Sequence, residues 1–196
     1  MTDTDILATE RISRLGIPDE DSLPPQVAAL YANLEKQGGV SNWIKAVAVH
    51  PAIMRRFLSY YEKVFSPAEG ALPMAEREMI ASVVSHINGC TYCTLHHTGG
   101  LAGQIHDSER AQRIAHNYRE VNLTDRERAI CDFAAHVTES ADRMSDGDFQ
   151  ALRDVGLGDT EIFEVLEIAG FFSFSNRMAT ALAILPDSAL FDFQRR

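Results

Sequence analysis

The chain has 196 residues, 45% hydrophobic and 23% charged, a length and balance typical of one globular domain rather than a disordered chain. Its formal net charge is −10, with 28 acidic against 18 basic residues, so it should repel a phosphate backbone, and we expect no nucleic-acid partner. No stretch approaches the roughly 18 apolar residues of a membrane span, and the polar start MTDTDILATERISRL does not resemble a signal peptide, so we expect a cytoplasmic protein without membrane contact.

Apolar residues recur at helical spacing along almost the whole chain. The first predicted helix begins at Pro25 and ends at the glycine pair 38–39. The second follows Pro51 and ends in SPAEG, residues 66–70. A third carries the apolar stripe of Ile80, Val83, Val84 and Ile87 and stops at the Asn-Gly pair 88–89. A fourth opens within residues 88–97, and the glycine pair 99–100 could end it.

The second half continues the helical pattern up to Pro186. The predicted helix starts are marked, in chain order, by Ser108, by the capping box of Thr124 and Glu127, by Ser145 with Asp148, and by Asp159. The last helix is long and apolar and should run to Leu185. Because no alternating strand pattern occurs, we predict an all-α single domain of about eight helices, in which residues 1 to about 70 form a helical extension.

Two segments of the predicted helices resemble each other. EREMIASVVSH at 76–86 and RERAICDFAAH at 126–136 share an apolar pattern and a terminal histidine. Without gaps, this offset places Ser140 and Arg143 opposite Cys90 and Cys93. A duplicated helical unit, with chemistry only in the first copy, is therefore one interpretation; chance similarity of two amphipathic helices is the other.

The stretch NGCTYCTLHH, residues 88–97, holds two cysteines and two histidines. At 100° per residue, Cys90, Cys93 and His97 share one face of a helix, whereas Tyr92 and His96 point elsewhere. Cys90 should lie in the first turn, where free backbone N–H groups favour a thiolate. A Cys-x-x-Cys pair in a reducing compartment is typical of redox or metal chemistry rather than of a structural disulfide.

Glu78, on the preceding helix, lies off the apolar stripe and shares a side with Ser82 and Ser85. This stripe of one carboxylate and two hydroxyls could face solvent. It could equally line a pocket that the cysteine helix closes.

The segment EREMIASVVSHINGCTYCTLHH, with Glu78, Cys90, Cys93 and His97 at these spacings, resembles the alkylhydroperoxidase D-like branch of the carboxymuconolactone decarboxylase family, and more closely its peroxidase-related subfamily. The C-terminal GFFSFSNRMATAL and the N-terminal helices resemble it too, so the resemblance covers nearly the whole chain. It implies the alkylhydroperoxidase D-like fold, a trimer or hexamer, and a peroxidase that needs no cofactor.

By position, the resemblance implies that Cys93 attacks a peroxide, that Cys90 resolves the product as a disulfide, and that Glu78 and His97 relay a proton through a water. An external dithiol, lipoyl- or thioredoxin-like, would then reduce the disulfide. Helix-start reasoning instead favours Cys90 as the thiol of lower pKa. In the best-known members a second histidine stands where this chain has Tyr92.

Other interpretations of these residues are open. Both cysteines could simply pack in the core. Cys90, Cys93 and His97 could also bind zinc, with His96, His86 or Glu78 as the fourth ligand. The protein would then be a redox-sensing or zinc-binding module without catalysis.

The sequence also predicts the surroundings of several further residues. Cys131 should be a core residue; His86, His116 and His136 should lie on helix surfaces or at an interface, and His106 in a loop. Arg177 is either paired with Glu164 or Glu167, or exposed, with a substrate or interface clamp as the functional alternative. The apolar run FFSF at 171–174 predicts an oligomer interface, or else a pocket lining.

Overall fold

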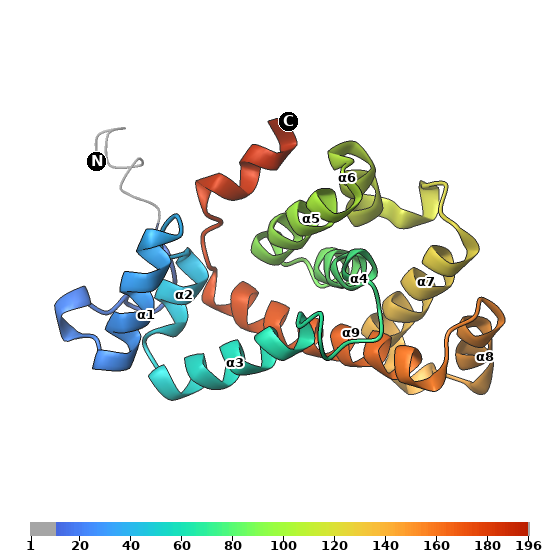
Figure 1. The fold of residues 1–196 in the computed structure, drawn as a ribbon, viewed down its shortest axis with the longest axis horizontal. Helices are drawn as coiled ribbons and strands as arrows, with labels where there is room; N and C mark the ends of the chain where they lie inside the picture. Colours follow the sequence, from blue (N-terminus) through green and yellow to red (C-terminus); the bar gives the residue numbers. More distant parts are fainter. Residues whose placement is uncertain (1–10, 196) are drawn as a thin grey trace, which may run out of the picture.

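The computed structural model describes residues 11–195, which form helices and, within that range, no strand (Figure 1). The predicted all-α fold is confirmed. Residues 1–10, which include part of the polar start and of the predicted extension, lie outside the described residues. The α-helices are α1 (Pro25–Lys36), α2 (Asn42–Val47), α3 (Pro51–Val64), α4 (Met74–Ile87), α5 (Thr91–Ile105), α6 (Ser108–Asn117), α7 (Asp125–Ser140), α8 (Asp146–Asp154) and α9 (Asp159–Leu182).

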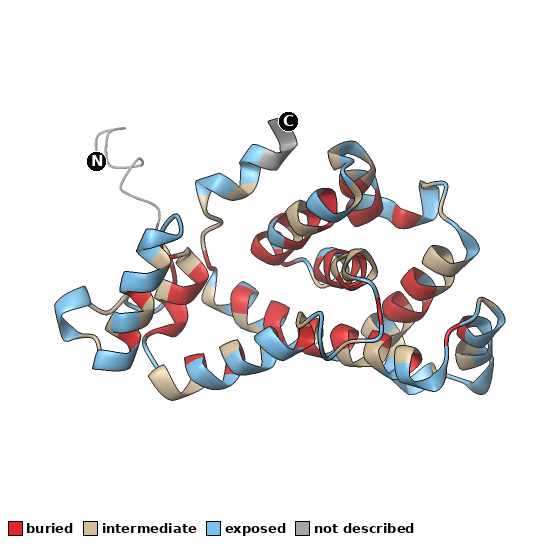
Figure 2. Ribbon diagram, viewed as in Figure 1, coloured by how far each residue is buried: buried red, intermediate tan, exposed pale blue. Residues whose placement is uncertain are grey.

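Helix α4 lies in the middle of the fold, in contact with α5, α6, α7 and α9 (Figure 1). Eight of its nine positions from 77 to 85 are buried, and these form the red part of α4 in Figure 2. Such a helix meets protein on every side. Glu78 and the two serines of its polar stripe therefore do not form a solvent face, because both serines are fully buried.

Two helix ends and one short helix differ from the sequence prediction. Helix α5 does not end at the glycine pair 99–100 but continues to Ile105, because α4 packs along it and supports the glycines. Helix α9 ends at Leu182, where Ala183 takes a left-handed conformation (φ 49°), three residues before the predicted end. Helix α2 was not predicted; its six residues are too few to show a period, and the Ser41 side chain caps it.

The helix starts follow the sequence closely. The capping boxes of Thr124 with Glu127 and of Ser145 with Asp148 are both present, as predicted. Helix α6 is capped by Asp107, one residue before the predicted Ser108. Helix α9 likewise starts one residue early, where Glu161 accepts the backbone N–H of Gly158 at 2.7 Å.

The two similar segments lie on α4 and α7, and these helices pack against each other. Arg126 at the start of α7 forms a two-point ion pair with Glu76 at the start of α4, at 2.7 and 3.0 Å. Duplication of a helical unit stays a prediction.

Aromatic side chains attach the N-terminal helices to the rest of the fold. Trp43 of α2 packs on Phe57 of α3 (ring centroids 4.7 Å apart), and Phe57 packs on Phe171 of α9 (5.3 Å). This contact places α2 and α3 over the side of α5 that carries the cysteines. No helix within residues 11–195 has the length and apolarity needed to cross a membrane.

Candidate active site

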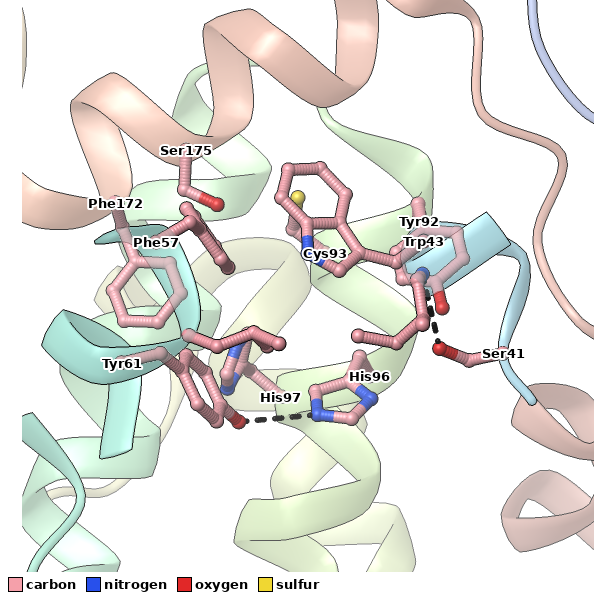
Figure 3. A pocket seen from close by; sticks show the side chains of 12 residues that line it. Ser41, Trp43, Phe57, Tyr61, Tyr92, Cys93, His96, His97, Phe172 and Ser175 are labelled. Carbon is pink, nitrogen blue, oxygen red and sulfur yellow. Dashed lines mark hydrogen bonds between the residues drawn. The ribbon is translucent and has the colours of Figure 1, made fainter. Parts of the chain in front are cut away.

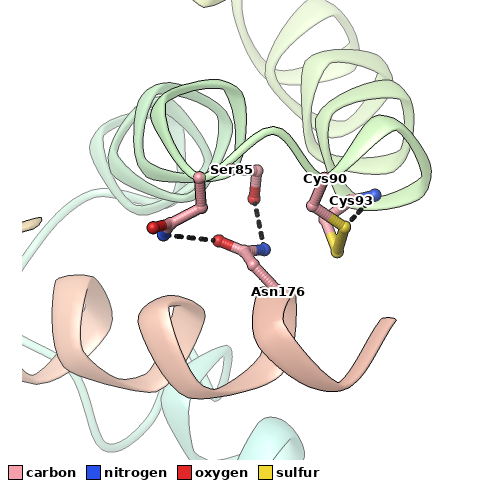
Figure 4. Close-up of a disulfide and its surroundings, with 5 residues drawn as sticks. Ser85, Cys90, Cys93 and Asn176 are labelled. Carbon is pink, nitrogen blue, oxygen red and sulfur yellow. Dashed lines mark hydrogen bonds between the residues drawn. A yellow bond between two sulfur atoms is a disulfide. The ribbon is translucent and has the colours of Figure 1, made fainter. Parts of the chain in front are cut away.

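The two cysteines of the motif form a disulfide at the start of α5 (Figure 4). Cys90 is the N-cap of this helix, and its Sγ accepts the backbone N–H of Cys93 at 3.2 Å. Both residues are buried, at 2% and 5% exposure. A sulfur in this position lies at the positive end of the helix dipole, which favours the thiolate once the disulfide is reduced.

His97 and Glu78 form the second part of the site, across the contact between α5 and α4. His97 donates from Nδ1 to Glu78 Oε2 at 2.8 Å, and His97 is only 3% exposed. An ionised carboxylate can only accept, so the lone pair of a neutral His97 is on Nε2. Phe172 and Phe65 pack against the imidazole, with ring centroids at 4.4 and 5.5 Å, and hold its orientation.

A cavity of about 170 Å³ opens beside Cys93 and His97 (Figure 3). Helices α2, α3, α5 and α9 each contribute a wall. We call it the aromatic cavity, because seven of its twelve lining residues carry aromatic rings: Trp43, Phe57, Tyr61, Tyr92, His96, His97 and Phe172. Cys90 does not line it.

Tyr61 and His96 face each other in this cavity, with Tyr61 Oη 3.3 Å from His96 Nε2 (Figure 3). Burial and the nearby charge of Glu78 raise the pKa of Tyr61. The pKa of His96 is lowered, because packing around the ring desolvates its charged form and His97 would repel that charge, although His96 is partly open to solvent. Tyr61 therefore keeps its proton and donates a hydrogen bond to Nε2 of a neutral His96.

Tyr92 and His96 were expected to point away from the face of Cys93 and His97, and this expectation is wrong, since all four line the aromatic cavity. The reason is that side chains of α2 and α3 close the cavity opposite α5, so the cavity spans more of the α5 circumference than one face. Tyr92 donates to Asp187 Oδ2 at 2.8 Å, and burial, followed by this bond, raises its pKa. It is 8% exposed.

The hydroxyl stripe of α4 meets α9 (Figure 4). Asn176 donates to Ser85 Oγ at 3.0 Å and accepts from the side chain of Asn88, also at 3.0 Å. This chain of bonds ties the turn before Cys90 to α9. Ser82 is completely buried but makes no hydrogen bond through its hydroxyl.

No group of three or more His, Cys, Asp or Glu side chains between residues 11 and 195 is arranged to hold a metal ion. The zinc interpretation of Cys90, Cys93 and His97 therefore gains no support from the geometry. Cys131 is fully buried, as expected, and burial raises its pKa.

The remaining histidines lie where the sequence placed them or close to it. His86 and His116 are exposed and adjacent, with ring centroids 5.3 Å apart. His136 is partly buried and bonded to Asp148 at 2.9 Å. His106 ends α5 in a left-handed conformation, φ 54°.

Arg177 is exposed and donates to the Ser173 carbonyl, so of the alternatives simple exposure holds. The carboxylate of Glu164 pairs with Arg77 instead. In the run FFSF, Phe171 and Phe172 are buried, and Phe172 lines the aromatic cavity. Phe174 is 52% exposed.

Sequence reasoning missed two residues that support the site. Arg77 is 1% exposed and anchors the loop between α3 and α4. Gly100 faces Glu78 so closely that a Cβ there would lie 2.5 Å from the Glu78 Cδ. A glycine inside a helical pattern is the signal that could have indicated this approach.

Comparison with known proteins identifies the family. Residues 51–134 match the carboxymuconolactone decarboxylase family. An uncharacterized peroxidase-related protein from Ralstonia eutropha JMP134, described as an alkylhydroperoxidase AhpD core, is 31% identical, with a TM-score of 0.87 over 93% of this chain and 96% of that one. Another peroxidase-related protein, from Silicibacter sp. TM1040, is 32% identical, with a TM-score of 0.86 and the same coverage. A search of curated proteins gave no match.

A more distant structure has the same fold. The debrominase Bmp8 in complex with 2,3,4-tribromopyrrole is 18% identical, with a TM-score of 0.75 over 96% of this chain and 97% of that one. The chain thus has the all-helical fold shared by peroxidase-related proteins and by this debrominase. It belongs to the alkylhydroperoxidase D-like branch of the carboxymuconolactone decarboxylase family.

Proposed function

We propose that the protein is a thiol-dependent peroxidase that uses Cys90 and Cys93 in a disulfide cycle. The observation that carries the proposal is the disulfide itself, whose Cys93 half lines a cavity together with His97, a histidine already paired with Glu78. The family membership supports a redox role.

In the proposed reaction, His97 accepts the proton of the Cys93 thiol, and Glu78 holds the imidazole and stabilises its positive charge. The thiolate attacks one peroxide oxygen, the O–O bond breaks, and the other oxygen leaves as an alcohol or water after protonation. Cys93 is now a sulfenic acid. The Cys90 thiolate attacks its sulfur, water leaves, and the disulfide forms. An external dithiol then restores both thiols.

Separate cysteine variants test the two roles. With tert-butyl hydroperoxide and dithiothreitol, we expect Cys93→Ser and Cys90→Ser both to lose multiple turnover. Only Cys90→Ser should form a sulfenic acid, which dimedone traps, because Cys93 survives there without its resolving partner. Cys131→Ser is the control and should turn over normally, since Cys131 is buried away from the cavity. Equal turnover in wild type and both active-site variants would exclude the peroxidase; oxidation without repeated turnover in wild type would favour a redox sensor.

We also propose that the protein forms a homo-oligomer, a trimer or hexamer, through the outer face of α9. Phe163 and Phe174 are 70% and 52% exposed. They lie eleven positions apart, which returns to the same helix face, and exposed apolar patches typically mark contact surfaces.

Sedimentation tests this interface. Phe163→Asp with Phe174→Asp should yield the 21.7 kDa monomer, because two buried charges would oppose association. Leu15→Asp, at another exposed apolar residue, should leave the assembly intact. A monomeric wild type would contradict the proposal.

A further inference from the structure

A second cavity, of about 150 Å³, reaches the other half of the disulfide. Cys90 lines it and Cys93 does not, the reverse of the aromatic cavity. We call it the Cys90 cavity; its lining residues are Gly89, Cys90, Thr91, Tyr92, Ala179, Thr180, Ala183 and Ile184. The two cavities share only Tyr92, so each cysteine is approached through its own space.

Tyr92 forms part of the wall that divides the two spaces. Its hydroxyl is fixed to Asp187, and the other oxygen of that carboxylate accepts the backbone N–H of Asn42 at the start of α2. Its ring faces Trp43 of α2, with centroids 6.4 Å apart. The tyrosine is therefore held from α2 and from the segment after α9, and it cannot easily swing aside to join the cavities.

We propose that the two cavities serve the two halves of the cycle: peroxide reaches Cys93 through the aromatic cavity, and the reducing dithiol attacks Cys90 through the Cys90 cavity. This inference rests on the proposed disulfide cycle but adds the site and the direction of reduction. The Cys90 cavity is lined mostly by small side chains and by no charged one, so it fits a slender, uncharged aliphatic thiol.

The chemistry follows from which sulfur is attacked. Thiolate attack on a disulfide proceeds through a mixed disulfide and expels the sulfur that is not attacked. A thiolate of the dithiol bonds to Cys90 Sγ, the Cys90–Cys93 bond breaks, and Cys93 leaves with the electron pair on the side of the aromatic cavity, where it accepts a proton.

The second step releases the reductant. Its other thiol, deprotonated, attacks the reductant sulfur held in the mixed disulfide, closes the reductant's own disulfide and expels Cys90 as a thiolate. The helix N-terminus stabilises that thiolate, so Cys90 is a good leaving group at this step. Two electrons pass from the dithiol to the enzyme disulfide. Both cysteines are then free for the next peroxide.

The position of the first adduct tests the direction of attack. The oxidised full-length protein is mixed with 2-mercaptoethanol, quenched in acid at the earliest times, alkylated with N-ethylmaleimide and sequenced by tandem mass spectrometry. We expect mercaptoethanol on Cys90 and maleimide on Cys93. The opposite assignment would overturn the proposal.

Two cavity-filling variants test the routes. Thr180 is exposed at the Cys90 cavity and Leu58 is half-buried at the aromatic cavity. Thr180→Trp should slow reduction by dithiothreitol at least about tenfold, because access limits the exchange rate, and should slow oxidation by tert-butyl hydroperoxide much less. Leu58→Trp should show the reverse. Arg177→Trp, exposed on α9 outside both cavities, is the control for a tryptophan on the surface.

Each half-reaction is measured alone, the reduction without any peroxide. If Leu58→Trp slows reduction and Thr180→Trp does not, the proposed route is wrong. If neither wild type nor the variants react with peroxide while the mercaptoethanol adduct still forms on Cys90, the peroxidase proposal fails and the proposed route of reduction stands. Circular dichroism measures helix content and so identifies a variant that does not fold. In that case the position of the mercaptoethanol adduct on the wild-type protein tests the direction of attack.

Discussion

Replacing Gly100 with alanine should lower kcat/KM for peroxide about 100-fold, which is the size of effect expected when a general base loses its support, while the fold survives. The alanine Cβ would lie 2.5 to 2.7 Å from the carboxylate atoms of Glu78. That carboxylate is the far end of a flexible side chain, so it can move away without unfolding α4 or α5. Its bond to His97 Nδ1 then breaks. Gly100 is in this sense a positioning residue.

Steady-state kinetics over a range of pH provides the readout. The pH profile should change shape in Gly100→Ala as it does in Glu78→Gln, because in both variants the histidine lacks its carboxylate partner. The double variant should lose little beyond either single one, since both changes remove the same interaction. Gly103→Ala is the matched control: it lies one turn further along α5 with open space around it, and should leave kinetics unchanged. Normal activity in Gly100→Ala would contradict the assigned role of Glu78.

Removing Arg77 should have the largest effect on stability. Its side chain is 1% exposed and forms an ion pair with Glu164 of α9, with Nε 2.8 Å from Oε1. It also donates to the backbone carbonyls of Leu72 and Ser66, both at 2.9 Å. Glu164 in turn accepts the Leu72 N–H at 3.0 Å. The pair therefore joins the loop before α4 to α9, which carries one wall of the aromatic cavity.

For Arg77→Met we expect the free energy of unfolding to fall by about 3–5 kcal/mol, because the Glu164 side chain, only 11% exposed, loses its cation. For a domain of this size the midpoint of thermal unfolding should fall by about 6–20 °C. Arg113→Met is the matched control. Arg113 pairs with Glu109 one turn away on the same helix, and the two side chains are 68% and 75% exposed. Because this pair is exposed, Arg113→Met should lower the free energy of unfolding by only about 0.3–0.5 kcal/mol. Similar losses in both variants would show that the Arg77 pair is not a structural anchor.

Most helices of this protein could be predicted from local sequence. Their apolar periods, prolines and capping boxes act within a few residues, and the predicted starts agree with the structure to within one or two positions. The failures have two causes. The glycine pair 99–100 looks like a helix end when α5 is considered alone, and only the contact with α4 overrides it. Helix α2 was missed because six residues carry too little pattern.

In the candidate site, too, local spacing predicted some features and tertiary contacts decided the others. Spacing along one helix brought Cys90, Cys93 and His97 together, and resemblance to a family added Glu78. The pairing of Glu78 with His97 needs α4 against α5, which no helical period encodes. The expected direction of Tyr92 was wrong for the same reason, since it depends on where α2 and α3 lie.

The helical class of this protein is determined by short-range spacing in the sequence itself, and the family and the four residues proposed for chemistry follow from the resemblance of the sequence motif to a known family. The tertiary structure decided what surrounds them: an aromatic cavity at Cys93, a separate small cavity at Cys90, and a fixed tyrosine between them. Walls of a cavity come from helices far apart in the chain, and the free energy of packing that places them is a property of the whole fold.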